Sequence, residues 1–245
     1  MSFGSNQVPA GPGQPVDGTV RLNGVDVRTD ARAQGAYLTQ AFFWMFAGLL
    51  LTAGVAALVQ FSEGLLSFAA HNFLLLIIGQ FALVMILQLG IARVSATVAL
   101  GMFFVYAASL GITMGLIVSL YTGTSVVTAF LSASAMFGGA ALYGAVTKRS
   151  LAGIGGYLRI CVFGLIVAMV VNVFVGAGPL GWIISLIGVA LFTVLTAYHV
   201  QRITSGALVI ATGSVEKAAV IGALVLYLDF INLFLFLLRL SGGRR

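Results

Sequence analysis

The sequence contains very few charged residues. Only 7% of its 245 residues are Asp, Glu, Lys or Arg, whereas 60% are apolar. A soluble domain carries roughly 25% charged residues, which cover its surface. The 12 basic and 6 acidic side chains present cannot cover an apolar core of this size. The composition therefore excludes a soluble globular enzyme.

Cysteine is nearly absent as well. The single Cys161 lies inside an apolar run, which excludes an intramolecular disulfide and a cysteine-based metal site. The formal net charge is +6, but the basic residues stand singly at the ends of apolar runs. This spacing is typical of membrane topology signals rather than of a nucleic-acid-binding surface. We therefore expect the lipid bilayer, and not nucleic acid, as the partner.

Long runs with almost no charge predict membrane-spanning helices. About 20 helical residues cross the hydrocarbon core of a bilayer, and turn formers divide three long runs into two spans each. One further run carries the single charge Asp229. The runs are continuous rather than alternating, unlike the strands of a membrane β-barrel. The predicted fold is an all-α polytopic membrane protein with seven transmembrane helices, at 38–60, 73–92, 97–120, 125–146, 157–175, 180–201 and 218–239.

The charges also predict the ends of the domain and its orientation. Residues 1–36 are rich in proline and glycine and have no apolar stretch, so we expect a disordered cytoplasmic tail and no cleavable signal peptide. Residues 37–240 form the membrane domain, and 241–245 a short C-terminal tail. Lys and Arg occur before the first span and in the second, fourth and sixth loops, but not in the first, third or fifth. The positive-inside rule therefore places the N-terminus in the cytoplasm of a multi-pass protein of the inner (plasma) membrane.

Glycines are frequent within the spans. Examples are the pair Gly111 and Gly115, spaced as GxxxG, and the adjacent Gly138 and Gly139. Small residues let neighbouring helices approach closely. We interpret most of these glycines as packing positions, because a single GxxxG is weak support for dimerisation.

One acid lies deep in a predicted span. Asp229 stands about eleven residues into the last helix, where an unpaired carboxylate costs several kcal/mol. Three basic groups at the ends of other spans can reach it: Arg93, Arg159 and His199. Asn232 follows one turn after Asp229 and can add an oxygen ligand or a hydrogen bond on the same helix face.

Two interpretations of this polar cluster remain open. The cluster is a functional site, or it is an ion pair that only fixes the register of the helices. We interpret Tyr198 as an interfacial anchor and His71 as a solvated loop histidine.

Catalytic constellations are missing. An intramembrane aspartyl protease needs two membrane carboxylates, and the sequence has one. His199 has no accompanying nucleophile motif, and neither a phosphate-binding glycine loop nor a set of zinc ligands occurs. We therefore expect no enzymatic activity and no resident cofactor.

Three segments resemble a known family. The stretch 223–239, ALVLYLDFINLFLFLLR, closely resembles the last-helix signature of the Bax inhibitor-1 family. The stretch 143–156, YGAVTKRSLAGIGG, resembles the family's loop between spans four and five, and 47–54, AGLLLTAG, resembles its first span. The similarity extends over roughly residues 38–240.

The resemblance implies seven helices, with the last enclosed by the other six, and no catalysis. Bacterial members behave as pH-sensitive calcium leak channels, whose sensor is a pair of aspartates on helices six and seven, latched by an arginine from helix two. By this resemblance Asp229 corresponds to the second aspartate and Arg93 to the arginine. The first aspartate belongs to a Tyr-Asp-x-Gln pattern, which here reads Tyr198-His199-Val-Gln201.

The histidine changes the expected chemistry. Two close carboxylates repel when both are ionised, whereas a carboxylate attracts a protonated imidazole, and histidine side chains change charge near physiological pH. The hypothesis is a sensor of Asp229, His199 and Arg93, supported by Asn232 and Arg159, with a displaced or reversed pH response. Calcium prefers several oxygen ligands, so Asp229 alone is expected to be at most a weak, transient calcium ligand.

A second function class stays open. Some family members bind and restrain a membrane protease or another membrane protein, which needs no conduction. The sequence therefore allows a pH-responsive calcium channel or a non-conducting modulator.

Overall fold

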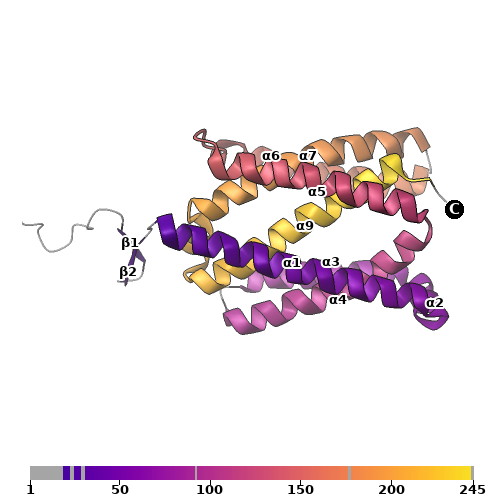
Figure 1. Cartoon of the computed structure of the whole chain (residues 1–245), viewed down its shortest axis with the longest axis horizontal. Helices are drawn as coiled ribbons and strands as arrows, with labels where there is room; N and C mark the ends of the chain where they lie inside the picture. Colours follow the sequence, from indigo (N-terminus) through magenta and orange to yellow (C-terminus); the bar gives the residue numbers. More distant parts are fainter. Residues whose placement is uncertain (1–18, 23–24, 29–30, 92, 176–177, 244–245) are drawn as a thin grey trace, which may run out of the picture.

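The chain forms a bundle of long helices (Figure 1). The computed structural model describes residues 19–22, 25–28, 31–91, 93–175 and 178–243. Within these residues, seven helices are long and apolar enough to cross a membrane. The protein is thus an all-α polytopic membrane protein, as predicted. The seven helices are α1 (Ala31–Phe61), α3 (Phe73–Gly90), α4 (Ala96–Ser119), α5 (Gly123–Val146), α6 (Gly155–Val175), α7 (Gly178–Thr204) and α9 (Val215–Ser241).

Short elements between the spans were not predicted. The residues Ser62-Glu63-Gly64, which are turn formers between the first two predicted spans, begin α2 (Glu63–His71), because the Ser62 hydroxyl caps that helix by accepting from the Leu65 amide. The 3₁₀ helix η1 (Ala152–Ile154) precedes α6, and α8 (Ala207–Thr212) links α7 to α9. These segments are too short to show a clear hydrophobic period.

The N-terminal region differs from the expectation in its described part. Most of the tail predicted to be disordered, residues 1–18, lies outside the described residues. Strand β1 (Thr19–Leu22) pairs antiparallel with β2 (Val25–Arg28), and α1 already begins at Ala31, before the expected boundary at residue 37. At the other end α9 stops at Ser241, and residues 244–245 of the predicted C-terminal tail are also outside the described residues.

Helix α9 runs diagonally through the centre of the bundle (Figure 1). It packs directly against α1, α4, α5 and α7, whereas α3 packs mainly on α4 and α6 mainly on α7. It is also the most deeply buried of the seven spans. Helix α9 is therefore enclosed by α1, α4, α5 and α7, whereas α3 and α6, which were expected to take part as well, lie outside this inner group. Large apolar side chains on these outer helices, such as Phe81 and Phe163, are exposed where lipid would surround the protein.

The packing role expected for glycines is confirmed for Gly111 and Gly115 but not for Gly138 and Gly139. A Cβ atom on Gly111 or Gly115 would lie 2.7 or 2.6 Å from the Cβ of a valine on α1, so the GxxxG pair lets α4 and α1 approach within the same chain. In contrast, a Cβ on Gly138 or Gly139 would meet no atom within 4 Å. The packing interpretation is wrong for this adjacent pair, because both glycines are on the exposed side of α5.

Several buried polar side chains form hydrogen bonds between helices of the bundle. The Thr52 hydroxyl on α1 lies 2.6 Å from the Tyr227 hydroxyl on α9 and 2.9 Å from the Ala107 carbonyl on α4. Gln80 on α3 donates to the Thr113 hydroxyl of α4 at 2.7 Å. An unpaired polar group costs several kcal/mol in an apolar medium. These bonds therefore specify how α1, α3, α4 and α9 pack.

Candidate functional site

The site is a hydrogen-bonded pair between two neighbouring helices. His199 Nδ1 lies 2.6 Å from Asp229 Oδ2, which makes the contact a hydrogen bond and, when the imidazole is protonated, an ion pair. The Asp229 side chain is 3% exposed and the His199 side chain 17%. The carboxylate is thus shielded, and the imidazole is the member of the pair that is partly accessible.

The packing of α7 on α9 brings the two residues together. Asp229 lies next to the midpoint of α9, about 21 Å along the axis from Val215 at 1.5 Å per residue. His199 lies only five residues before the end of α7 at Thr204. Because α9 crosses the bundle diagonally (Figure 1), the middle of α9 meets the final turns of α7.

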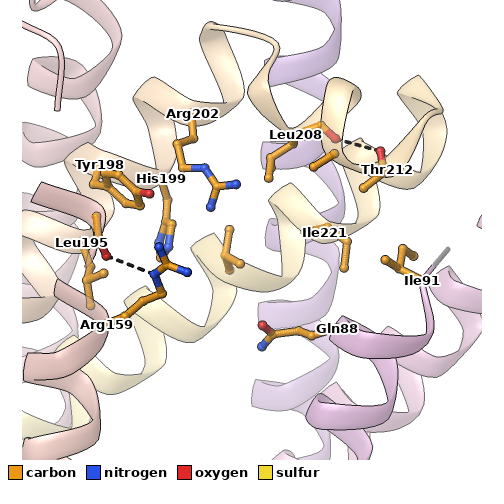
Figure 2. Close-up of a pocket in the computed structure, with 13 residues that line it drawn as sticks. Gln88, Ile91, Arg159, Leu195, Tyr198, His199, Arg202, Leu208, Thr212 and Ile221 are labelled. Atoms are coloured by element: carbon orange, nitrogen blue, oxygen red, sulfur yellow. Dashed lines mark hydrogen bonds between the residues drawn. The ribbon is translucent and has the colours of Figure 1, made fainter. Parts of the chain in front are cut away.

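A pocket of about 340 Å³ opens in front of His199. Two further basic side chains line it, Arg159 from α6 and Arg202 from α7, and Figure 2 shows them gathered with His199 on one side. The Arg159 Nε donates to the Gly155 carbonyl at 3.2 Å, and the Arg202 guanidinium lies 5.7 Å from the ring centroid of Tyr198. The pocket beside Asp229 therefore has a positively charged wall.

Arg93 does not join this arrangement. It lies in the turn after α3 with an exposed side chain, it does not line the pocket, and within the described residues Asp229 bonds to His199 instead. The end of α3 reaches the pocket through Gln88 and Ile91, whereas Arg93 lies beyond it in the turn toward α4. The expected contact of Arg93 with Asp229 is absent from this arrangement, and the role of Arg93 as a latch stays a prediction.

Arg159 and Asn232, the two supporting residues of the predicted sensor, make different contacts in the structure. Arg159 lies in the pocket with His199 but does not bond to Asp229 among the described residues. Asn232 donates to the Leu228 carbonyl of its own helix at 2.8 Å, so its amide is used within α9. The described residues hold no group of three or more His, Cys, Asp or Glu side chains arranged for a metal. Among the described residues, Asp229 is the acidic side chain at the pair from which a calcium ion could gain a ligand.

The sequence interpretation missed two contributors. Arg202 is one of the basic residues of the sixth loop that enter the prediction only as topology signals, although its spacing of three residues from His199 on one helix places both on the same face. Gln201 enters the prediction only as part of the Tyr-x-x-Gln pattern. Its side chain accepts from the Leu151 amide at 2.6 Å and donates to the Arg149 carbonyl at 2.8 Å. These two bonds fix the α5–α6 loop against the end of α7. Nothing in the local sequence indicates a partner 50 residues away.

The interpretation of Tyr198 as an interfacial anchor stays a prediction, and that of His71 is confirmed in its exposure only. Tyr198 is buried, and its hydroxyl occupies the space that a Cβ on Gly155 would need, so it packs α7 against the start of α6. His71 is exposed as expected, but it ends helix α2 and its Nδ1 bonds to the Ser67 carbonyl.

Comparison with known proteins assigns the bundle to a family. Residues 34–245, nearly all of the helical part, match the family described as Inhibitor of apoptosis-promoting Bax1. The chain belongs to the Bax inhibitor-1 family. The match covers the seven spans together with both members of the His199–Asp229 pair.

Bacterial relatives of the family cover most of the chain. It is 44% identical over 209 residues to a protein of Deinococcus radiodurans, covering 85% of this chain and 90% of the relative. It is 41% identical over 215 residues to the inner membrane protein YbhL of Escherichia coli, with 85% and 92% covered. The protein YrjE of Lactococcus lactis is 38% identical over 235 residues, with 91% and 100% covered. This Bax inhibitor-1 family chain therefore resembles each relative along almost its whole length.

Proposed function

We propose that the protein is a non-enzymatic, pH-responsive leak pathway for calcium ions, shut by the His199–Asp229 pair. The observation that carries the proposal is the 2.6 Å contact between these residues of α7 and the central helix α9. The family's bacterial members, as the sequence resemblance implies, use an acidic pair in the same two helices. YbhL is named an inner membrane protein, which supports the inner membrane as the location of this chain.

The surroundings of the pair favour a shut state. His199 stands between Asp229 and the pocket, so a cation in the pocket does not reach the carboxylate directly. Arg159 and Arg202 add positive charge to the pocket, and like charges repel strongly where the dielectric constant is low. A calcium ion is therefore excluded until the pair separates.

The sign of the pH response follows from the charge states of the pair. A neutral imidazole can still donate from Nδ1 to an ionised carboxylate, so raising the pH creates no repulsion. Lowering the pH far enough to protonate Asp229 removes the ionised acceptor of this hydrogen bond, and a bond to a neutral carboxyl group is weaker than one to a carboxylate. The pair is then weakest in acid. Two carboxylates behave in the opposite way, because they repel when both ionise at alkaline pH.

Calcium flux into liposomes tests this prediction. Flux through the wild-type protein is expected to rise on acidification, and flux through His199→Asp to rise on alkalinisation. Because a charge-assisted hydrogen bond contributes about 1.5–3 kcal/mol, each response should reach roughly tenfold or more. Asp229→Asn should lose most of its pH dependence, since it removes the carboxylate.

The second histidine provides a matched control. His71→Gln removes an exposed imidazole on α2 and should leave the pH profile unchanged. Identical profiles for the wild type, His199→Asp and Asp229→Asn would contradict the assignment of the pair. Flux no greater than in protein-free liposomes at every pH would contradict conduction. Such a result, together with a stoichiometric membrane protein in a pull-down, would favour the non-conducting modulator.

A further inference from the structure

The pocket in front of His199 has a strong imbalance of charge. Arg159 and Arg202 line it, and His199 adds a third positive charge when protonated. No acidic side chain of the described residues lines the pocket, and the nearby carboxylate of Asp229 is already bonded to His199. Two guanidinium groups that share a partly enclosed space repel each other. A bound anion would remove that repulsion.

The position of the pocket is that of a membrane interface site. It lies at the end of the bundle where α7 stops and α9 begins. Gln88 and Ile91 line it from the end of α3, and Arg159 lines it from the start of α6. Figure 2 shows Gln88 and Ile91 across the pocket from Arg159. Helices α3 and α6 do not pack against each other. No extensive packing of α3 on α6 therefore closes this side of the pocket.

The walls of the pocket combine two kinds of surface. The guanidinium forks lie on one side, and the rest of the wall is largely apolar, with Leu195, Leu208, Ile221 and Val225. Guanidinium groups match the oxygens of phosphate in a bidentate geometry. A ligand that suits both surfaces carries a phosphate next to an apolar part.

We propose that this pocket, which we call the arginine pocket after Arg159 and Arg202, binds a phosphate group, with an anionic phospholipid headgroup as the ligand that its walls fit best. Basic pockets between transmembrane helices at the membrane interface are suited to such headgroups. A soluble phosphate ester shares the charged part of this chemistry but lacks the apolar part. The proposal concerns binding and does not depend on ion permeation.

Native mass spectrometry of the full-length protein in detergent tests the proposal. Phosphatidylglycerol and phosphatidylcholine of the same acyl chains are added in parallel, and inorganic phosphate is added as a soluble competitor. We expect one retained phosphatidylglycerol and weaker retention of phosphatidylcholine. Arg159→Gln and Arg202→Gln should each weaken phosphatidylglycerol binding about fivefold, and the double variant about thirtyfold.

Controls separate the site from general attraction to charge. Lys148→Gln removes an exposed basic residue near the same end of the bundle but outside the pocket, and it should bind phosphatidylglycerol like the wild type. The melting temperature without lipid checks that each variant folds. If Arg202→Gln does not fold, the exposed Arg159→Gln alone carries the test.

Each outcome of the measurement decides a point. Unchanged phosphatidylglycerol binding in the folded arginine variants overturns the proposal, as does equal retention of phosphatidylcholine. Displacement of the lipid by millimolar inorganic phosphate in the wild type, but not in the arginine variants, supports the phosphate site. It also identifies a soluble phosphate as a sufficient ligand. Lipid binding without such displacement supports the phospholipid as the ligand.

Discussion

At the scale of single residues, the His199–Asp229 pair determines much of the protein's chemistry. A carboxylate that is 3% exposed in the middle of a transmembrane helix needs a partner, and His199 Nδ1 provides it at 2.6 Å. Breaking a buried pair is more damaging than replacing it altogether, because one polar group is then left uncompensated. The pair should therefore show strong energetic coupling.

A double-mutant cycle measures this coupling. His199→Leu leaves the Asp229 carboxylate buried without its partner and is expected to lower the free energy of unfolding by about 3–5 kcal/mol. The double variant with Asp229→Leu should be less destabilised than the sum of the two single variants, since neither polar group remains. Reversible unfolding in mixed micelles gives the four values. Additive effects of the two single variants would mean that the contact contributes nothing to stability.

At the scale of elements, the position of the pair depends on how closely α7 approaches its neighbours. A Cβ on Gly144 of α5 would overlap the backbone carbonyl of Ala197 on α7. Ala197 precedes His199 by two residues. Because Gly144 has no side chain, α7 can lie against the backbone of α5. This close packing sets the position of the His199 imidazole.

Replacing glycine by alanine at two places on α5 tests this close approach. Gly144→Ala should destabilise the bundle by about 1–3 kcal/mol, because backbone atoms must move to admit the methyl group. Gly138→Ala is the matched control, since its Cβ would meet no atom within 4 Å. The control should be neutral or stabilising by up to about 1 kcal/mol through helix propensity. Thermal melting in detergent compares the two variants, and equal destabilisation of both would contradict the packing argument.

At the scale of the whole molecule, most basic loops gather at one end of the bundle. The end of α3, the α5–α6 loop and the end of α7 meet there, and the arginine pocket lies among them. Helix α9 ends at the opposite end, where the C-terminus lies in Figure 1. The positive-inside rule predicts that the basic end faces the cytoplasm.

Cysteine labelling in intact cells tests this orientation. The single Cys161 is first replaced by serine, and one new cysteine is then introduced at exposed Ser150 in the α5–α6 loop or at exposed Ser241 at the end of α9. A membrane-impermeant maleimide should label Ser241→Cys in intact cells, and Ser150→Cys only after the cells are opened. The reverse pattern would show that the N-terminus is outside.

Much of the architecture could be predicted because the bilayer imposes it. A span needs about 20 apolar residues and a charge is costly inside it, so the runs between charges predict each of the seven helices without knowledge of their contacts. The same cost identifies Asp229 as a buried acid that needs a partner. The short helices α2 and α8 and the hairpin β1–β2 escaped prediction, because no such constraint acts on connecting or terminal segments.

The choice of partners could not be predicted in the same way. Arg93, Arg159 and His199 were all candidates for Asp229, because each stands at the end of a span. Which of them reaches the carboxylate depends on the diagonal path of α9 and on the placement of α3 against α4, and only His199 does so among the described residues.

The sequence by itself thus determined the class of protein, its seven spans, its family resemblance and its one deeply buried acid, because these follow from local composition and spacing. The tertiary structure alone decided the His199–Asp229 bond, the peripheral place of Arg93 and the convergence of Arg159 with Arg202 in one pocket. Side-chain contacts between helices depend on their tilt and rotation. Tilt and rotation result from packing over the whole bundle and are not written in any single run of residues.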